Sequence, residues 1–141
     1  MEKKVTKSTM IAAAVEAVIA VFMILAVKVF APVCTGMLET TAGKQVPMRC
    51  HYAAAAAVIL AVLWIVNAAV CFAVKQKTAC GIMTIAIAVC VFVILNSTIG
   101  MGICANPDMA CNITAPYMKL CATLEMITGA VSVFLGMKES K

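Results

Sequence analysis

The second of four long apolar stretches decides the fold class, and residues 52–74 read YAAAAAVILAVLWIVNAAVCFAV. This stretch has no charged residue, and Asn67 is its only side-chain amide. An α-helix rises about 1.5 Å per residue, so about 20 apolar residues cross the hydrocarbon core of a bilayer. Residues 52–74 are therefore predicted to form a transmembrane helix.

Three further windows of this kind cover most of the remaining chain: residues 10–31, 78–104 and 115–137. The chain of 141 residues is 65% hydrophobic and 12% charged, whereas about 25% of the residues of a soluble domain are charged. This composition argues against a soluble globular protein, and it excludes intrinsic disorder, which needs low hydrophobicity. The sequence predicts an all-α fold, an integral membrane four-helix bundle in which residues 1–141 form a single transmembrane domain.

Lysine and arginine residues outside the apolar windows predict the orientation of this bundle. One side carries Lys3, Lys4, Lys7, Lys75, Lys77, Lys138 and Lys141, if all four windows span the membrane. The other side carries only Lys44 and Arg49, with Lys28 and Lys119 near the helix ends. Because cytoplasmic flanks are enriched in Lys and Arg, both termini are predicted to be cytoplasmic. The first window is followed by no A-x-A cleavage site, so we expect it to be a retained span and not a signal peptide.

The two outward connections share a pattern that indicates an internal repeat. In the first, Cys34 follows a span and Met48-Arg49-Cys50 precedes the next one. In the second, Cys104 follows a span and Met109-Ala110-Cys111 precedes the next one. Parallel duplications occur in membrane folds. We therefore interpret the chain as two parallel helix–loop–helix repeats.

The predicted topology divides the eight cysteines into two groups. Cys34, Cys50, Cys104 and Cys111 lie on the outer side, where disulfides persist. We favour the local pairs Cys34–Cys50 and Cys104–Cys111, which would clip the two outer loops, and pairing across the copies is the main alternative. The inner group is expected to be reduced and to pack as small apolar side chains. This group consists of Cys71, Cys80, Cys90 and Cys121.

Two chemical roles compete with structural disulfides at the outer cysteines. A redox role would use a reactive thiol, and Cys50 lies between Arg49 and His51, but the chain contains no C-x-x-C motif. A metal role would use the soft ligands Met48, Cys50 and His51. However, His51 is the only histidine, and the second copy has Asn112 in its place. The sequence therefore favours disulfides and predicts no metal, no cofactor and no catalytic residue.

Four polar residues fall within the predicted spans and are candidates for function by default: Glu16, Glu125, Asn67 and Asn96. Glu16 is about two turns inside the first span, and we expect its side chain to reach the cytoplasmic interface. Glu125 is near the middle of the fourth span. We expect Glu125 to be protonated, to be hydrogen bonded to Asn67, Asn96 or Thr128, or to face a partner protein.

The outer motifs resemble those of a family of uncharacterised bacterial four-span membrane proteins that share a domain of unknown function. The resemblance rests on Phe30-Ala31-Pro32-Val33-Cys34, on Met48-Arg49-Cys50-His51, and on the motifs within residues 99–116. It implies a multi-pass protein of the bacterial plasma membrane. Members of the family are similar to small accessory proteins that are encoded beside ABC transporters with MacB-like permeases.

Three hypotheses for function follow from the sequence. The first is a non-enzymatic accessory or structural subunit of a bacterial membrane complex, associated with an ABC transporter permease. The second is an envelope thiol–disulfide oxidoreductase that uses the outer cysteines. The third is a small transporter or channel built around Glu125. The expected surroundings are the lipid bilayer and a larger membrane protein complex. No nucleic-acid partner is expected, because the net charge of +5 is accounted for by the topology.

Overall fold

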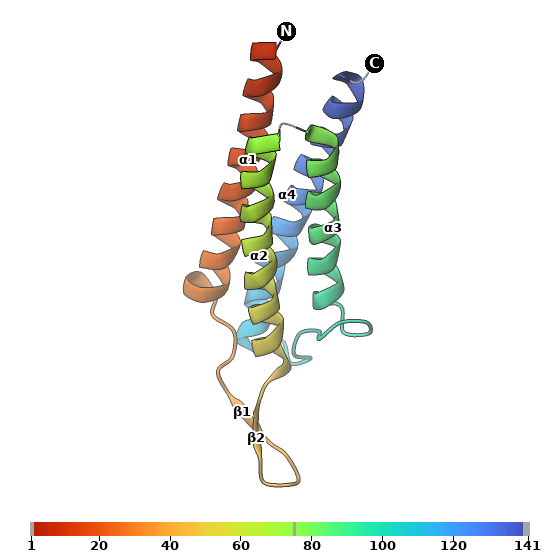
Figure 1. Ribbon diagram of the computed structural model, residues 1–141. Coiled ribbons are helices and arrows are strands. Elements are labelled where there is room, and N and C mark those ends of the chain that lie inside the picture. The colour runs from red at the N-terminus through yellow and green to blue at the C-terminus, as the bar shows by residue number, and fades with distance from the viewer. Residues whose placement is uncertain (1, 75, 140–141) are drawn as a thin grey trace.

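The computed structural model describes residues 2–74 and 76–139, and it confirms the predicted all-α fold (Figure 1). Four helices form a bundle, and a small β hairpin, which the sequence analysis did not predict, interrupts the first connection. In chain order the elements are α1 (Glu2–Leu25), a π-helical turn η1 (Ala26–Phe30), β1 (Met37–Glu39), β2 (Gln45–Pro47), α2 (Arg49–Val74), α3 (Lys77–Leu95) and α4 (Ala110–Glu139).

Each of the four helices is long and apolar enough to cross a membrane. The candidate spans are Lys7–Phe30, Arg49–Val74, Lys77–Leu95 and Ala110–Lys138. About 20 residues suffice for a span, and the shortest of the four has 19. The chain is therefore a multi-pass membrane protein with four helices in the bilayer.

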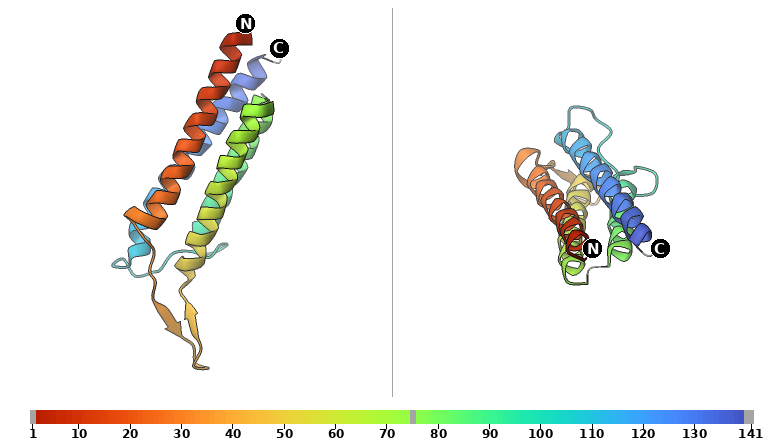
Figure 2. Two further views of the ribbon diagram at one scale, coloured as in Figure 1. Left: turned by 60° about the vertical axis from the view of Figure 1, so that its left-hand side comes forward. Right: turned by 90° about the horizontal axis from the view of Figure 1, so that it is seen from above.

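The helices run alternately up and down, so the two ends of the bundle differ. Both termini and the short link between α2 and α3 lie at one end, which we call the terminal end (Figure 1). The β hairpin and the connection between α3 and α4 lie at the other, which we call the hairpin end (Figure 2). Of the lysines that predict the orientation, Lys75 and Lys141 lie outside the described residues.

The third helix is shorter than the predicted window of residues 78–104. α3 ends at Leu95, and Asn96 adopts an extended conformation while its backbone N–H still bonds to the carbonyl groups of Phe92 and Val93. The Asn96 side chain then accepts the backbone N–H of Thr98 at 2.9 Å. Such local bonds compete with helix formation, so the polar residues end the helix although apolar residues follow. α4, in contrast, begins at Ala110, before the predicted start at residue 115.

Small side chains fill the centre of the bundle. Ala20, Ala61, Ala88 and Ala122 are fully buried in the same hydrophobic core as Trp64. α3 and α4 approach each other closely where Gly81 faces Gly129, because a Cβ atom added at Gly81 would lie 2.6 Å from the carbonyl oxygen of Gly129. Without a hydrophobic force between helices in lipid, close packing of small residues holds them together.

The β hairpin extends the chain beyond the helix ends (Figure 1). Its strands are antiparallel, and Met37 lies opposite Pro47. The turn is closed by Thr40, whose Oγ1 donates to the carbonyl oxygen of Lys44 at 2.9 Å. The strands have almost no buried side chains, and Leu38 is 54% exposed. A hairpin of two short strands with no core is only marginally stable by itself.

Candidate functional site

Four cysteines from separate parts of the chain meet at the hairpin end of the bundle. We call Cys34, Cys50, Cys104 and Cys111 the thiol cluster. Cys50 and Cys111 are the second residues of α2 and α4, and each is 1% exposed. Cys34 and Cys104 lie on the connections that precede these helices, and both are partly exposed. The cluster thus has two buried cysteines and two partly exposed ones.

The sulfur atoms of the cluster are close to one another. The Sγ atoms of Cys34, Cys50 and Cys111 all lie within 4.8 Å of each other. The thiol of Cys104 donates to Sγ of Cys50 at 3.8 Å. The thiol of Cys34 also contacts Sδ of Met109 at 3.6 Å. These contacts place five sulfur atoms in one small region.

The buried cysteines occupy the same local structure in both copies of the repeat. The carbonyl oxygen of Met48 accepts the backbone N–H of His51 at 2.9 Å, and that of Met109 accepts the N–H of Asn112 at 2.9 Å. Each Met-x-Cys motif therefore forms the turn that begins a helix. This equivalence supports the interpretation of the sequence as two parallel helix–loop–helix repeats.

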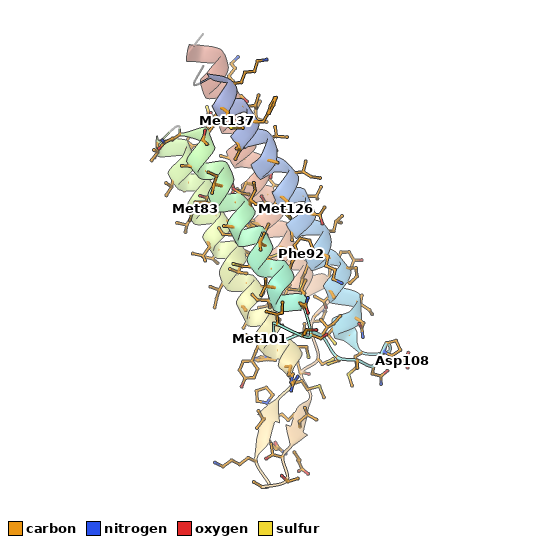
Figure 3. The ribbon with its side chains drawn as sticks, turned by 90° about the vertical axis from the view of Figure 1, so that its right-hand side faces the viewer. Met83, Phe92, Met101, Asp108, Met126 and Met137 are labelled. Carbon is orange, nitrogen blue, oxygen red and sulfur yellow. A yellow bond between two sulfur atoms is a disulfide. The ribbon has the colours of Figure 1, made fainter. Side chains whose placement is uncertain are left out.

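Side chains of α4 hold the connections that carry the exposed cysteines. Asn112 Nδ2 donates to the carbonyl oxygen of Cys104 at 3.2 Å and to that of Asn106 at 2.5 Å. Thr114 Oγ1 donates to the carbonyl oxygen of Ala31 at 2.5 Å. Met101 and Asp108 lie along the same connection between α3 and α4 (Figure 3). The residue that replaces His51 in the second copy, Asn112, thus positions Cys104.

The two accessible thiols of the cluster differ in acidity. The backbone N–H of Cys111 holds the pKa of Cys34 below its usual range, and the N–H of Ala110 acts in the same direction. These N–H groups begin α4, and a helix N-terminus favours negative charge. The pKa of Cys104 is raised instead: a hydrogen bond with Cys111 lowers it, but burial and the contact with Cys50 together raise it more. Cys34 is therefore the more readily ionised thiol.

The bonding of the cysteines differs from the expectation for the inner group. All four cluster cysteines are free thiols in the structure, so neither Cys34–Cys50 nor Cys104–Cys111 is formed, and disulfides among them stay a prediction. Cys71 and Cys80, which we expected to be reduced, form a disulfide at the terminal end. The short link between α2 and α3 brings their Cα atoms to 5.8 Å, which is within the range for a disulfide.

The ligand candidates Met48 and His51 do not join the thiol cluster. The methyl group of Met48 lies beside Gly36, 3.0 Å from the position that a Cβ atom on Gly36 would occupy. The imidazole of His51 is exposed and packs edge-on against Tyr52, with ring centroids 5.9 Å apart. The thioether beside the cluster comes instead from Met109 of the second copy, which contacts Cys34 of the first copy. Sequence spacing could not reveal this contact, because 75 residues separate the two side chains.

A second group of polar side chains lies inside the bundle and joins three helices. Asn67 Nδ2 on α2 donates to Glu16 Oε1 on α1 at 2.7 Å, and Thr84 Oγ1 on α3 lies 2.9 Å from the same oxygen. The indole of Trp64 donates to the backbone oxygen of Thr84 at 3.3 Å. Glu16 is 6% exposed, so the expectation that its side chain reaches the interface is wrong. It is instead bound within the bundle.

Glu125 is fully buried, which rules out the expectation that it faces a partner protein. Its Oε2 accepts from Thr128 Oγ1 at 3.3 Å, while its Oε1 has no hydrogen-bond partner among the described residues. Asn67 binds Glu16, and Asn96 is exposed at the C-terminus of α3. Of the amide and hydroxyl partners expected for Glu125, only Thr128 is confirmed.

A cavity of about 250 Å³ opens beside this polar group, towards the terminal end. All four helices line it, and its polar lining includes Glu16, Thr84 and Thr128. The disulfide cysteines Cys71 and Cys80 also line it. The thiol cluster and this cavity are thus separate sites at opposite ends of the bundle.

The comparisons with known proteins identify the family of this chain. No protein with a curated description matches it, and no solved structure matches it. One family model matches residues 16–135, and this range includes the whole thiol cluster together with Glu16 and Glu125. Because the match covers most of the 141 residues, the chain belongs to the family described as "Domain of unknown function (DUF4418)".

Proposed function

We propose that this protein is a membrane thiol–disulfide exchange protein and that the thiol cluster is its reactive centre. The observation that carries the proposal is the convergence of four thiols from both repeats, with Cys34 placed at the N-terminus of α4. A reactive cysteine needs a lowered pKa, some exposure and a second thiol within reach. Cys34 has all three, although the chain lacks the C-x-x-C motif.

The proposal places the hairpin end outside the bacterial plasma membrane. It rests on the excess of Lys residues at the terminal end, which favours cytoplasmic termini. The thiol cluster would then face the extracytoplasmic proteins with which it exchanges disulfides. The mechanism needs this orientation, because its substrates are disulfides of other extracytoplasmic proteins.

The exchange begins when the thiolate of Cys34 attacks one sulfur of a substrate disulfide. A mixed disulfide forms, and the second substrate sulfur leaves as a thiolate. Cys111, which is hydrogen bonded to Cys34, gives its proton to the substrate thiolate formed in the first step and attacks Cys34 Sγ, and the first substrate sulfur leaves as a thiolate. The substrate is reduced by two electrons, and the Cys34–Cys111 dithiol becomes a disulfide.

The second pair of thiols completes the cycle. Cys50 and Cys104 lie beside the new disulfide and can take it over by the same exchange. A second extracytoplasmic dithiol protein then reduces Cys50–Cys104 and itself becomes oxidised. The net reaction transfers one disulfide between two external proteins, so no electron acceptor within the membrane is needed.

The decisive experiment is to trap the mixed disulfide in the full-length protein. In the variant Cys111→Ser, Cys34 still attacks but lacks its hydrogen-bonded resolving thiol, so a covalent adduct with a disulfide-bonded substrate peptide should accumulate. The adduct should be absent in the double variant Cys34→Ser/Cys111→Ser. Cys90→Ser is the matched control, since Cys90 is a free cysteine on α3 outside the cluster. Equal adduct formation in the double variant would overturn the proposal.

The exposed hairpin favours a second candidate function, that of an accessory subunit in a larger membrane complex. Met37, Leu38 and Val46 expose apolar surface on strands that have little support from the bundle. A partner that covers them would stabilise the hairpin. We propose that this partner is an integral membrane protein complex with an outer domain, such as an ABC transporter with a MacB-like permease.

Gentle solubilisation followed by identification of co-purifying proteins tests this second candidate. A specific partner should be recovered with the natural chain and lost with Leu38→Asp, which places a charge on the exposed strand. Thr41→Asp is the control, because it adds the same charge in the turn, outside the strands. Recovery of a partner-free monomer from native membranes would contradict the accessory role.

A further inference from the structure

We propose that the reduced thiol cluster is a binding site for monovalent copper, Cu(I), formed by Cys34, Cys50 and Cys111 with Met109 at its edge. The inference rests on the proposed function in one respect: the cluster must have a state in which its thiols are reduced. It concerns a ligand that the exchange reaction does not use. Cys104 provides a fourth thiol beside this set.

The spacing of the sulfur atoms fits a metal–thiolate centre. Metal–thiolate bonds of about 2.3 Å place the sulfur ligands of a three- or four-coordinate ion about 4 Å apart. The Sγ atoms of Cys34, Cys50 and Cys111 lie within 4.8 Å of one another, and Cys104 lies 3.8 Å from Cys50. Shifts of side-chain rotamers are therefore enough to bring three thiolates onto one ion.

The chemistry of the ligands selects the metal. All of the close donors are sulfur atoms, and soft thiolate and thioether ligands favour Cu(I) and zinc over harder ions. Met109 distinguishes these two, because its thioether lies 3.6 Å from Cys34 Sγ and zinc sites in proteins use Cys, His and carboxylate ligands. His51, which would suit zinc, is exposed and packs against Tyr52 instead.

The surroundings of the site suit a metal ion that must be protected from water. Cys50 and Cys111 are buried at the ends of two membrane helices. Cys34 is partly exposed, and it provides the route by which an ion reaches the buried thiols.

An anaerobic competition titration tests the inference on the reduced, full-length protein in detergent. Cu(I) is supplied as its complex with the chromophoric chelator bicinchoninate, and transfer to the protein is followed by the loss of colour. We expect one Cu(I) per chain. The triple variant Cys34→Ser/Cys50→Ser/Cys111→Ser should lose this binding, and the double variant Cys90→Ser/Cys121→Ser should keep it. Helical content and Trp64 fluorescence verify that each variant is folded.

The contribution of the thioether is tested by Met109→Leu, which removes sulfur but keeps the size of the side chain. This variant should bind Cu(I) about tenfold more weakly. It should bind Cd(II), a thiolate probe that needs no thioether, with unchanged affinity. No stoichiometric Cu(I) binding, unchanged binding in the triple variant, or a stronger preference for Zn(II) than for Cu(I) would each overturn the assignment.

The trapping experiment on the same preparations separates this inference from the proposed function. Cu(I) binding without a mixed disulfide in Cys111→Ser would support the copper site and contradict thiol–disulfide exchange. A mixed disulfide without Cu(I) binding would support the exchange and overturn the copper site. Each proposal therefore has a result that affects it alone.

Discussion

The Sγ atoms of Cys104 and Cys50 lie 3.8 Å apart, although 54 residues separate them in the chain. This contact joins the second copy of the repeat to the first at the hairpin end. The local pairings that the sequence favoured would each close one loop, whereas this contact crosses between the copies. The tertiary packing of the four helices thus sets which thiols can react with each other.

Mild oxidation of the reduced protein is expected to link Cys50 to Cys104 and Cys34 to Cys111. The Cys50–Cys104 contact and the hydrogen bonds between Cys34 and Cys111 favour this pattern over the local one. Mass spectrometry of proteolytic peptides from the oxidised protein identifies the pairs. A majority of Cys34–Cys50 and Cys104–Cys111 peptides would contradict the prediction and restore the local pairing.

Cys34 is expected to react with a water-soluble thiol reagent faster than Cys104 at neutral pH. The lowered pKa of Cys34 means that its thiolate is present above that value and is lost only as the pH falls through it. The pKa of Cys104 is raised, so its labelling should increase only above the ordinary range for thiols. Labelling at several pH values with peptide-level detection measures both rates. Equal rates across this pH range would refute the assigned acidities.

Replacement of the two buried carboxyl groups by leucine is expected to have different effects on stability. Glu16→Leu removes the acceptor of Asn67 and Thr84 and should cost about 1–3 kcal/mol for the two hydrogen bonds. Glu125→Leu should be neutral or stabilising, because it removes an unpartnered oxygen and Thr128 keeps its bond to the backbone oxygen of residue 125.

Thermal unfolding in detergent measures both effects, and the single tryptophan, Trp64, reports on the region because it bonds to Thr84. Glu16→Gln is the control, since its amide oxygen can accept the same two hydrogen bonds. If Glu125→Leu preserves the fold but abolishes a transport or growth phenotype, the hypothesis of a transporter built around Glu125 gains support. Unfolding of Glu125→Leu would contradict the stability argument.

Gly81→Ala is expected to destabilise the pairing of α3 with α4. The added Cβ would lie 2.6 Å from the backbone oxygen of Gly129 and 2.7 Å from Val133, so the helices must separate. Overpacking of this kind costs about 1–3 kcal/mol. The variant should therefore unfold at a lower temperature than the natural chain. Ile82→Ala, at an exposed position on the same helix, is the control and should have little effect on the temperature of unfolding.

Individual elements show how far the sequence could predict the fold. The window of residues 52–74 agrees with α2 to within three residues at its start, because an unbroken apolar run leaves a membrane helix as the only stable form. The window of residues 78–104 was too long, because hydropathy counts the apolar residues after Asn96. The helix itself ends at Leu95, where local hydrogen bonds of Asn96 replace the helical pattern. The hairpin was missed, because its two strands have only three residues each.

At the thiol cluster, too, the sequence predicted some features and missed others. The repeat of Met-x-Cys motifs identified Cys50 and Cys111 as equivalent positions, and both do begin helices. The contacts of Met109 with Cys34 and of Asn112 with Cys104 could not be predicted, because each depends on how the loops fold onto α4. Likewise, Asn67 and Thr84 meet Glu16 only because three helices pack together.

The sequence alone determined that the chain is a four-span membrane protein and that its hairpin-end cysteines occur in two matching sets. It could do so because helix formation in a bilayer depends on the apolar character of each segment, which is a local property. Tertiary structure decided that the two sets of cysteines form one cluster, that Cys71 bonds to Cys80, and that Glu16 and Glu125 are both buried. These features depend on which helix faces meet, and small residues such as Gly81 and Gly129 set those faces through close contact.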